Sequence, residues 1–216
     1  MAEQIVILDF GSQYTQVIAR RIRECKVYST ILRYDTPIKE ITRLQPKGII
    51  LSGGPSSVYS PKAPLPDKRL FTLTIPVLGV CYGLQIMAKY LGGKVEPGQK
   101  REYGKGTLSI KDGTSPLFHG LPDSLQVWNS HGDKISKLPD GFNPVAVSEN
   151  SSFAAFEDRT RHWYAIQFHP EVVHTQDGKA ILSNFLFKVC EVSGNWTPAS
   201  FIEEATASVK AQVGAS

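Results

Sequence analysis

The segment IPVLGVCYGLQIMAKYLGG, residues 75–93, joins a short apolar run, a cysteine and an amphipathic stretch. The run at 76–80 is typical of a buried strand, whereas the residues after Cys81 place apolar side chains at helical intervals. The two glycines at the end of the segment are typical of a helix terminus. The segment therefore predicts a strand, a sharp turn and a helix in direct succession.

The same alternation of strands and helices precedes this segment and predicts a mostly parallel open sheet flanked by helices. The expected strands are 5–10, 27–34 and 48–52, and the expected helices are 12–25, 37–44 and 68–74. The second half predicts an antiparallel extension, because its segments are shorter, alternate in polarity and are separated by turns. These segments are 100–113, 125–131, 143–150, 152–158 and 161–168, and a last amphipathic helix is expected at 178–192.

The composition excludes several classes of protein. The net charge of +4 is small, and the basic stretch ARRIREC has helical spacing, so a solvated helix face is expected there rather than a nucleic-acid surface. Cys25, Cys81 and Cys190 form neither a disulfide framework nor a metal-ligand pattern, so no metal is expected. The sequence shows neither a signal peptide nor an apolar run of about 18 residues, so no membrane contact is expected. We expect a reduced, cytoplasmic protein.

Cys81 lies in a G-x-C-x-G pattern between the expected strand and helix. This pattern is typical of a nucleophile elbow, in which flanking glycines permit a sharp turn. A cysteine at such a turn meets the positive end of the helix dipole, which favours a thiolate. The alternative is a buried structural cysteine, but such a residue would need neither Gly79 nor Gly83.

A nucleophilic cysteine requires a base and an acid that orients it, and the segment YAIQFHPEV supplies His169 and Glu171. Residues i and i+2 of an extended chain share one face, so the two side chains are expected to lie side by side. His169 would exchange the proton and Glu171 would fix the ring. On its own, a His-Pro-Glu sequence is more often an ordinary turn at a strand end, and only together with the cysteine elbow does it indicate a triad.

Two further segments could complete a site. In GIILSGGPSS, the amide of Gly54 could form an oxyanion hole with the amide of Tyr82, although a plain turn or a phosphate-binding loop is also compatible with the pattern.

In VWNSHGDK, His131 and Asp133 are expected in a polar loop after a strand. Such a loop suits an amino-acid ligand, although an exposed turn remains the alternative.

Together, these segments resemble the class I, triad-type glutamine amidotransferases, which carry the cysteine elbow, the HPE pair and the SGGP loop in this chain order. The resemblance is narrowed to members that serve GMP synthesis by the stretches DFGSQYTQVIARRIRE, GVCYGLQ, REYG, SHGDK, FHPEVVHT and WTPA. The resemblance implies a flavodoxin-like amidotransferase domain at 1–192. It also implies a linker at 193–216 that leads toward a synthetase unit, as in an excised domain or a separate subunit.

The resemblance further implies that Cys81 hydrolyses L-glutamine through a γ-glutamyl thioester, with Gln85, Ser130, His131 and Asp133 binding the substrate. Ammonia would pass to an ATP-pyrophosphatase synthetase unit that converts xanthosine monophosphate (XMP) to GMP. ATP and Mg²⁺ are expected only in that unit, with no cofactor in this chain, and full activity is expected to require that unit. The alternatives are an amidotransferase of another pathway, a γ-glutamyl hydrolase, a binding module without activity, or a phosphate-loop ATPase.

Overall fold

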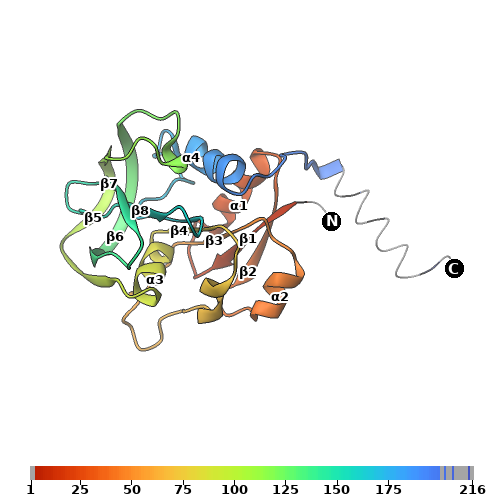
Figure 1. Ribbon diagram of the computed structural model, residues 1–216, viewed down its shortest axis with the longest axis horizontal. Coiled ribbons are helices and arrows are strands. Elements are labelled where there is room, and N and C mark those ends of the chain that lie inside the picture. The colour runs from red at the N-terminus through yellow and green to blue at the C-terminus, as the bar shows by residue number, and fades with distance from the viewer. Residues whose placement is uncertain (1–2, 200–201, 203–205, 207–213, 215–216) are drawn as a thin grey trace.

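The computed structural model describes residues 3–199 together with 202, 206 and 214, and the strands of these residues form a single nine-stranded sheet (Figure 1). The order across the sheet is β2-β1-β3-β4-β9-β8-β7-β5-β6. The strands are β1 (Gln4–Asp9), β2 (Tyr28–Arg33), β3 (Gly48–Leu51), β4 (Val77–Val80), β5 (Lys94–Ile110), β6 (Ser124–Lys137), β7 (Asn143–Val147), β8 (Ala155–Asp158) and β9 (Trp163–Ile166).

Helices cover both faces of the parallel part of the sheet. Figure 1 shows α1 and α4 on one face and α2 and α3 on the other. Side chains of β1 alternate accordingly, because Ile5 and Ile7 pack with α1 and α4 whereas Val6 and Leu8 pack with α2 and α3. The helices are α1 (Thr15–Glu24), α2 (Ile38–Arg43), α3 (Tyr82–Tyr90) and α4 (Gly178–Asn184), and the short helical turns are η1 (Lys68–Thr72), η2 (Pro116–Phe118) and η3 (Phe185–Val189).

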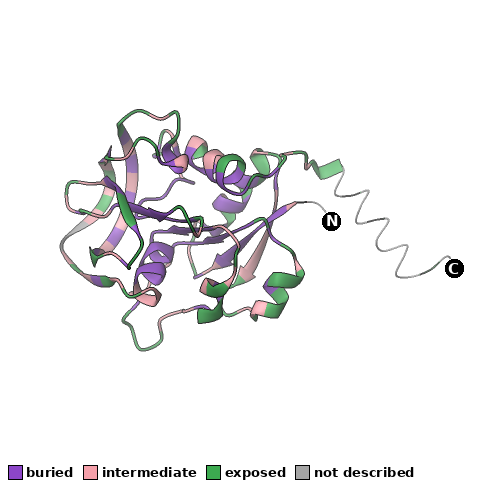
Figure 2. Ribbon diagram, in the orientation of Figure 1, coloured by how far each residue is buried: buried purple, intermediate pink, exposed green. Residues whose placement is uncertain are grey.

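The predicted mostly parallel sheet with an antiparallel extension is confirmed. Strands β2, β1, β3, β4 and β9 run parallel to one another, and β8, β7, β5 and β6 continue the sheet with antiparallel pairings. Strands β1, β3, β4 and β9 are almost entirely buried (Figure 2). Such burial explains why their sequences are continuously apolar rather than alternating.

Three sequence-based expectations differ from the structure. The segment 161–168 was expected in the antiparallel extension, but β9 pairs parallel with β4 on one side and antiparallel with β8 on the other. The expected helix 68–74 is only the 3₁₀ turn η1. The last expected helix changes from α-helical to π-helical at Phe185, and the chain leaves it before Glu191, which has a positive φ of 52°.

The predicted linker at 193–216 starts in contact with the domain. The carboxylate of Glu3 accepts hydrogen bonds from the backbone and hydroxyl of Ser193 at 2.7 and 2.5 Å. The amide of Trp196 donates to the carbonyl of Lys26 at 2.9 Å. Most of 200–216 lies outside the described residues, so the linker remains a prediction. No helix of the described part of the chain has the length and apolarity to cross a bilayer.

The start of α3 packs directly on β3, and Gly83 makes this close packing possible. A Cβ at Gly83 would collide with the carbonyl oxygen of Leu51 and would lie 2.7 Å from the Leu51 Cβ. The amide of Gly83 donates to the carbonyl of Ser52 at 3.2 Å, which fixes the same contact. Both sides of the contact are backbone, so neither can yield without moving β3 or α3.

We therefore expect Gly83→Ala to lower the free energy of unfolding by about 1–3 kcal/mol, the usual range for overpacking. Urea denaturation followed by circular dichroism would measure the change. Gly113→Ala is the matched control, because a Cβ at Gly113 meets nothing within 4 Å. Equal unfolding midpoints for the two variants would contradict this account of the α3–β3 contact.

Candidate active site

Cys81 lies in a strained turn between β4 and α3. Its φ of 52° and ψ of −101° are unusual for a residue other than glycine, and such backbone strain concentrates at functional sites. The Cys81 amide donates to the carbonyl of Ile166 at 2.8 Å, which ties the turn to β9. The side chain is 4% exposed, and its Sγ lies 3.7 Å from the carbonyl oxygen of Ser130 and 3.8 Å from Nε2 of Gln167. The predicted elbow geometry is therefore present.

His169 and Glu171 lie side by side next to Cys81, as the sequence predicted. The Nδ1 of His169 is 2.8 Å from Oε1 of Glu171, which is completely buried. Burial by itself would lower the pKa of His169, but hydrogen bonds and charge attraction from Cys81 and Glu171 outweigh it and raise that pKa above its usual value. The arrangement therefore favours the imidazolium form of His169.

The backbone of the His169–Glu171 turn is fixed by contacts that sequence analysis did not identify. The amide of His169 donates to the carbonyl of Trp128 on β6 at 3.0 Å. The Thr175 hydroxyl donates to the carbonyl of His169 at 2.6 Å and accepts from the Trp128 amide at 3.0 Å. Arg21 on α1 donates through Nε to the carbonyl of Glu171 at 3.1 Å. The only sequence signal for Thr175 was its place in the stretch FHPEVVHT.

A pocket of about 700 Å³ opens in front of Cys81 and His169. Gly54 and Tyr82, the predicted oxyanion residues, both line it. The amide of Tyr82 is the first in α3, where an N–H group has no partner within the helix. Neighbouring Gly53 gives His169 room, because a Cβ there would approach the ring Cε1 to 2.9 Å.

The predicted polar loop around His131 and Asp133 is wrong, because both residues lie inside β6. The strand continues through Gly132 because β5 pairs with it, placing Pro97 opposite Asp133. The carbonyl oxygen of Asp133 lies 3.1 Å from Nδ1 of His131 and 3.5 Å from Nε2 of Gln85. All four predicted substrate-binding residues line the pocket, and these are Gln85, Ser130, His131 and Asp133.

The N-terminal part of the chain also contributes to the pocket, although sequence analysis assigned it no role. Ser12, Gln13 and Tyr14 line the pocket between β1 and α1. The ring of Tyr14 meets His169 edge-on, with 5.1 Å between the ring centroids. The signal was the stretch DFGSQY, which belonged to the family resemblance without a stated function. Over the described residues, no group of three His, Cys, Asp or Glu side chains could hold a metal ion.

The family model for class-I glutamine amidotransferases matches residues 6–189 of the chain. The chain therefore belongs to the class I glutamine amidotransferase family, as its sequence motifs indicated. It is 54% identical over 98% of its length to a glutamine-hydrolysing GMP synthase of Gloeobacter violaceus and 50% identical over 97% to that of Aquifex aeolicus. The chain spans 38% and 41% of the lengths of these two relatives.

Solved structures agree with this assignment. A crystal structure of a Thermoplasma acidophilum protein, provisionally assigned as a subunit of GMP synthase, is 32% identical with a TM-score of 0.80. The match covers 95% of this chain and 98% of the Thermoplasma chain. A glutamine amidotransferase from Thermotoga maritima is 21% identical with a TM-score of 0.70, covering 88% of this chain and 99% of its own, and shows the shared fold.

The raised pKa of His169 leads to a test. Its imidazolium form contributes stability that is fully present below the unfolded pKa of about 6.5 and is lost as pH rises through the folded pKa. Glu171→Gln removes the carboxylate charge beside the ring, so we expect the pKa of His169 to fall toward its usual value. Nitrogen-15 NMR titration of the imidazole ring would measure the shift, with Glu40→Gln on α2 as control. An unchanged His169 titration in Glu171→Gln would contradict the assigned pairing.

Proposed function

We propose that this chain hydrolyses L-glutamine to glutamate and ammonia, with Cys81 as the nucleophile. The observation that carries the proposal is the placement of Cys81, His169 and Glu171 at one pocket, with the Cys81 turn held in a strained conformation. Nucleophile, base and orienting acid in this order are the parts that acyl transfer requires. Membership of the amidotransferase family supports the same reaction.

In the first step, the Cys81 thiolate attacks the side-chain amide carbon of glutamine. The amide oxygen becomes an oxyanion, which the backbone amides of Gly54 and Tyr82 stabilise. The His169 imidazolium donates its proton to the amide nitrogen as the carbon–nitrogen bond breaks. Ammonia leaves and a γ-glutamyl thioester remains on Cys81.

In the second step, water hydrolyses the thioester. Neutral His169 removes a proton from the attacking water, and the same oxyanion donors stabilise the second tetrahedral intermediate. The carbon–sulfur bond breaks, which releases glutamate and restores the Cys81 thiolate beside the His169 imidazolium. Glu171 keeps the ring oriented through both steps, because its Oε1 accepts from Nδ1 and leaves Nε2 for the chemistry.

The β6 side of the pocket binds the amino-acid part of glutamine. Asp133 pairs with the α-amino group, and Gln85, Ser130 and His131 complete the recognition of the backbone end of the substrate. Gln85 and His131 both contact the carbonyl of Asp133, so the three residues act as one wall. The side-chain amide of glutamine then extends toward Cys81.

The ammonia serves the conversion of XMP to GMP by a synthetase unit of the ATP-pyrophosphatase type. This part of the proposal rests on the relatives named glutamine-hydrolysing GMP synthase, of which the chain covers about two fifths. ATP and Mg²⁺ belong to the synthetase unit, and the residues of this chain take no part in binding them. Glutamine hydrolysis in the cytoplasm would then feed purine nucleotide synthesis.

We expect Cys81→Ala to reduce glutamine hydrolysis by at least about 10⁴-fold, because loss of a nucleophile removes the covalent route. Glutamate release measured with glutamate dehydrogenase gives the rate. Cys25→Ala is the matched control, because Cys25 is only partly buried and does not line the pocket. Unchanged hydrolysis in Cys81→Ala would refute the proposed nucleophile.

We also expect glutamine to support GMP formation from XMP and ATP when the chain is mixed with the synthetase unit of a relative. Nucleotide chromatography would measure GMP, and ammonium chloride in place of glutamine would show that the synthetase unit is competent. Glutamine hydrolysis should rise when the unit and XMP are present. If ammonium chloride supported GMP formation but glutamine with this chain did not, the assigned pathway would be wrong.

A further inference from the structure

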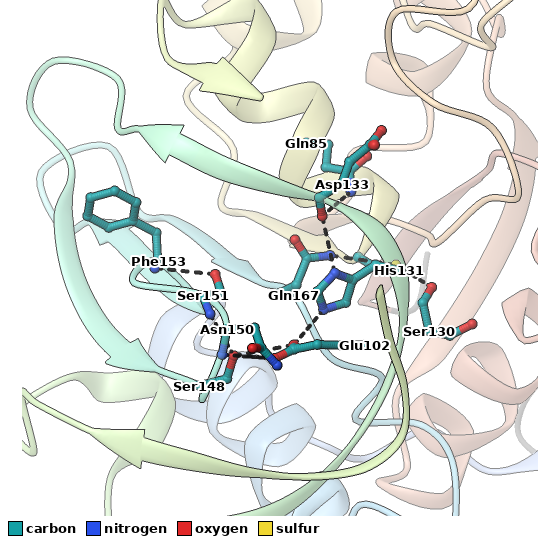
Figure 3. A network of polar contacts seen from close by, with 11 residues as sticks. Gln85, Glu102, Ser130, His131, Asp133, Ser148, Asn150, Ser151, Phe153 and Gln167 are labelled. Atoms are coloured by element: carbon teal, nitrogen blue, oxygen red, sulfur yellow. Dashed lines mark hydrogen bonds and ion pairs between the residues drawn. The ribbon is translucent and has the colours of Figure 1, made fainter. Parts of the chain in front are cut away.

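The carboxylate of Glu102 and the ring of His131 form a buried polar pair outside the proposed catalytic residues. They lie opposite each other on β5 and β6, with 3.0 Å between Oε2 of Glu102 and Nε2 of His131 (Figure 3). Their side chains are only 9% and 6% exposed. A carboxylate at this depth must be well satisfied by hydrogen bonds, because an unpaired buried charge is strongly destabilising.

The carboxylate of Glu102 is held from its other side by a turn at 148–151. The Ser148 hydroxyl and the Asn150 amide donate to Oε1 of Glu102 at 3.0 and 3.1 Å. The turn is closed by the Ser148 amide, which donates to the carbonyl of Ser151 at 2.9 Å. Burial would raise the pKa of Glu102, but His131, Ser148 and Asn150 lower it to about 2, so the group is a carboxylate at neutral pH.

His131 connects this carboxylate to the glutamine pocket. Its Nδ1 lies 3.1 Å from the carbonyl oxygen of Asp133, and its Nε2 lies 3.0 Å from Oε2 of Glu102. The same carbonyl lies within 3.5 Å of Nε2 of Gln85. Figure 3 shows this continuous series of contacts, which runs from the Ser148 turn through Glu102 and His131 to Asp133 and Gln85.

The position of Glu102 in β5 also indicates a structural role for its contact with His131. The β5–β6 register shifts between Pro97, which pairs with Asp133, and Glu102, which pairs with His131. Glu102 is where regular pairing resumes after this irregularity. A second cavity of about 290 Å³ lies beside the glutamine pocket, and His131, Gly132 and Asp133 line both cavities. The Glu102–His131 pair therefore supports the wall between the two cavities.

We infer that Glu102 is a positioning residue for glutamine binding, which acts by fixing His131 and, through it, the carbonyl of Asp133 and the side chain of Gln85. This inference rests on the proposed glutaminase function. Glu102 has no contact with Cys81, His169 or Glu171, so its contribution is to substrate affinity rather than to the bond-breaking steps. Ser148 and Asn150 act one step further away, by holding Glu102.

Glu102→Gln tests the inference, because it keeps the size of the side chain and removes the charge. We expect the KM for glutamine to rise about 10-fold, as loss of a charged hydrogen bond in a connected group commonly produces, with kcat within about 2-fold of wild type. Steady-state glutamate release, measured with saturating synthetase unit and XMP, gives both constants. A rise in KM at constant kcat distinguishes positioning of the substrate wall from general damage.

Three variants complete the design. Glu102→Asp keeps the charge and should restore KM to within about 3-fold of wild type, since most of the charge attraction is retained. Ser148→Ala removes a single hydrogen bond to Glu102, and we expect about a 3-fold rise in KM. Glu96→Gln is the control, because Glu96 is an acidic residue of the same strand whose ion pair with Lys94 is exposed, and its KM should be unchanged.

Alkylation by iodoacetamide separates this inference from the proposed function. Cys81 of Glu102→Gln should react at the wild-type rate, which shows that the fold and the nucleophile are intact.

If wild type hydrolyses glutamine and an intact Glu102→Gln has the wild-type KM, the inference is overturned and the proposed function stands. If Glu102→Gln fails to fold, an unchanged KM in Ser148→Ala overturns the inference. If wild type hydrolyses no glutamine with the synthetase unit present, the proposed function fails and the inference with it.

Discussion

The close packing of α3 on β3 is the constraint on which the site depends. Gly83 lets the helix start against the backbone of Leu51, and the chain must therefore turn sharply immediately after β4. Cys81 occupies that turn with a positive φ, and its amide is bonded to β9. The strain at Cys81 is thus sustained by packing that involves the centre of the sheet. Because parallel strands end at the same edge, Cys81 lies where ligands bind in open α/β sheets.

The second consequence of the sheet order is that β9 lies next to β4. The chain that leaves β9 passes directly beside the Cys81 turn, which brings His169 and Glu171 close to Cys81 without a long loop. Thr175 and Arg21 then hold the carbonyls of the His169–Glu171 turn from both sides. The backbone that carries the side chains of His169 and Glu171 therefore has little freedom to move. Preorganisation of this kind lowers the reorganisation that accompanies charge movement in a reaction.

Sequence alone predicted the parts of the site that depend on local pattern. The glycines around Cys81 and the two-residue spacing of His169 and Glu171 each describe a few consecutive residues, so their geometry follows from short-range rules. The position of His131 could not be predicted in this way, because Gly132 and its polar neighbours are typical of a turn. Only the pairing with β5 keeps that segment extended, and this register depends on residues about 30 positions away. Glu102, in the stretch REYG, could not be assigned a role from sequence either, because its contact with His131 depends on the same pairing.

Strand β6 supplies both the Trp128 carbonyl that accepts from the His169 amide and the Asp133 carbonyl that contacts His131 and Gln85. These two carbonyls lie five residues apart along the same strand. A displacement of β6 would therefore act on the backbone of His169 and on the Asp133 side of the pocket together, whereas the amide of Cys81 is bonded to Ile166 of β9.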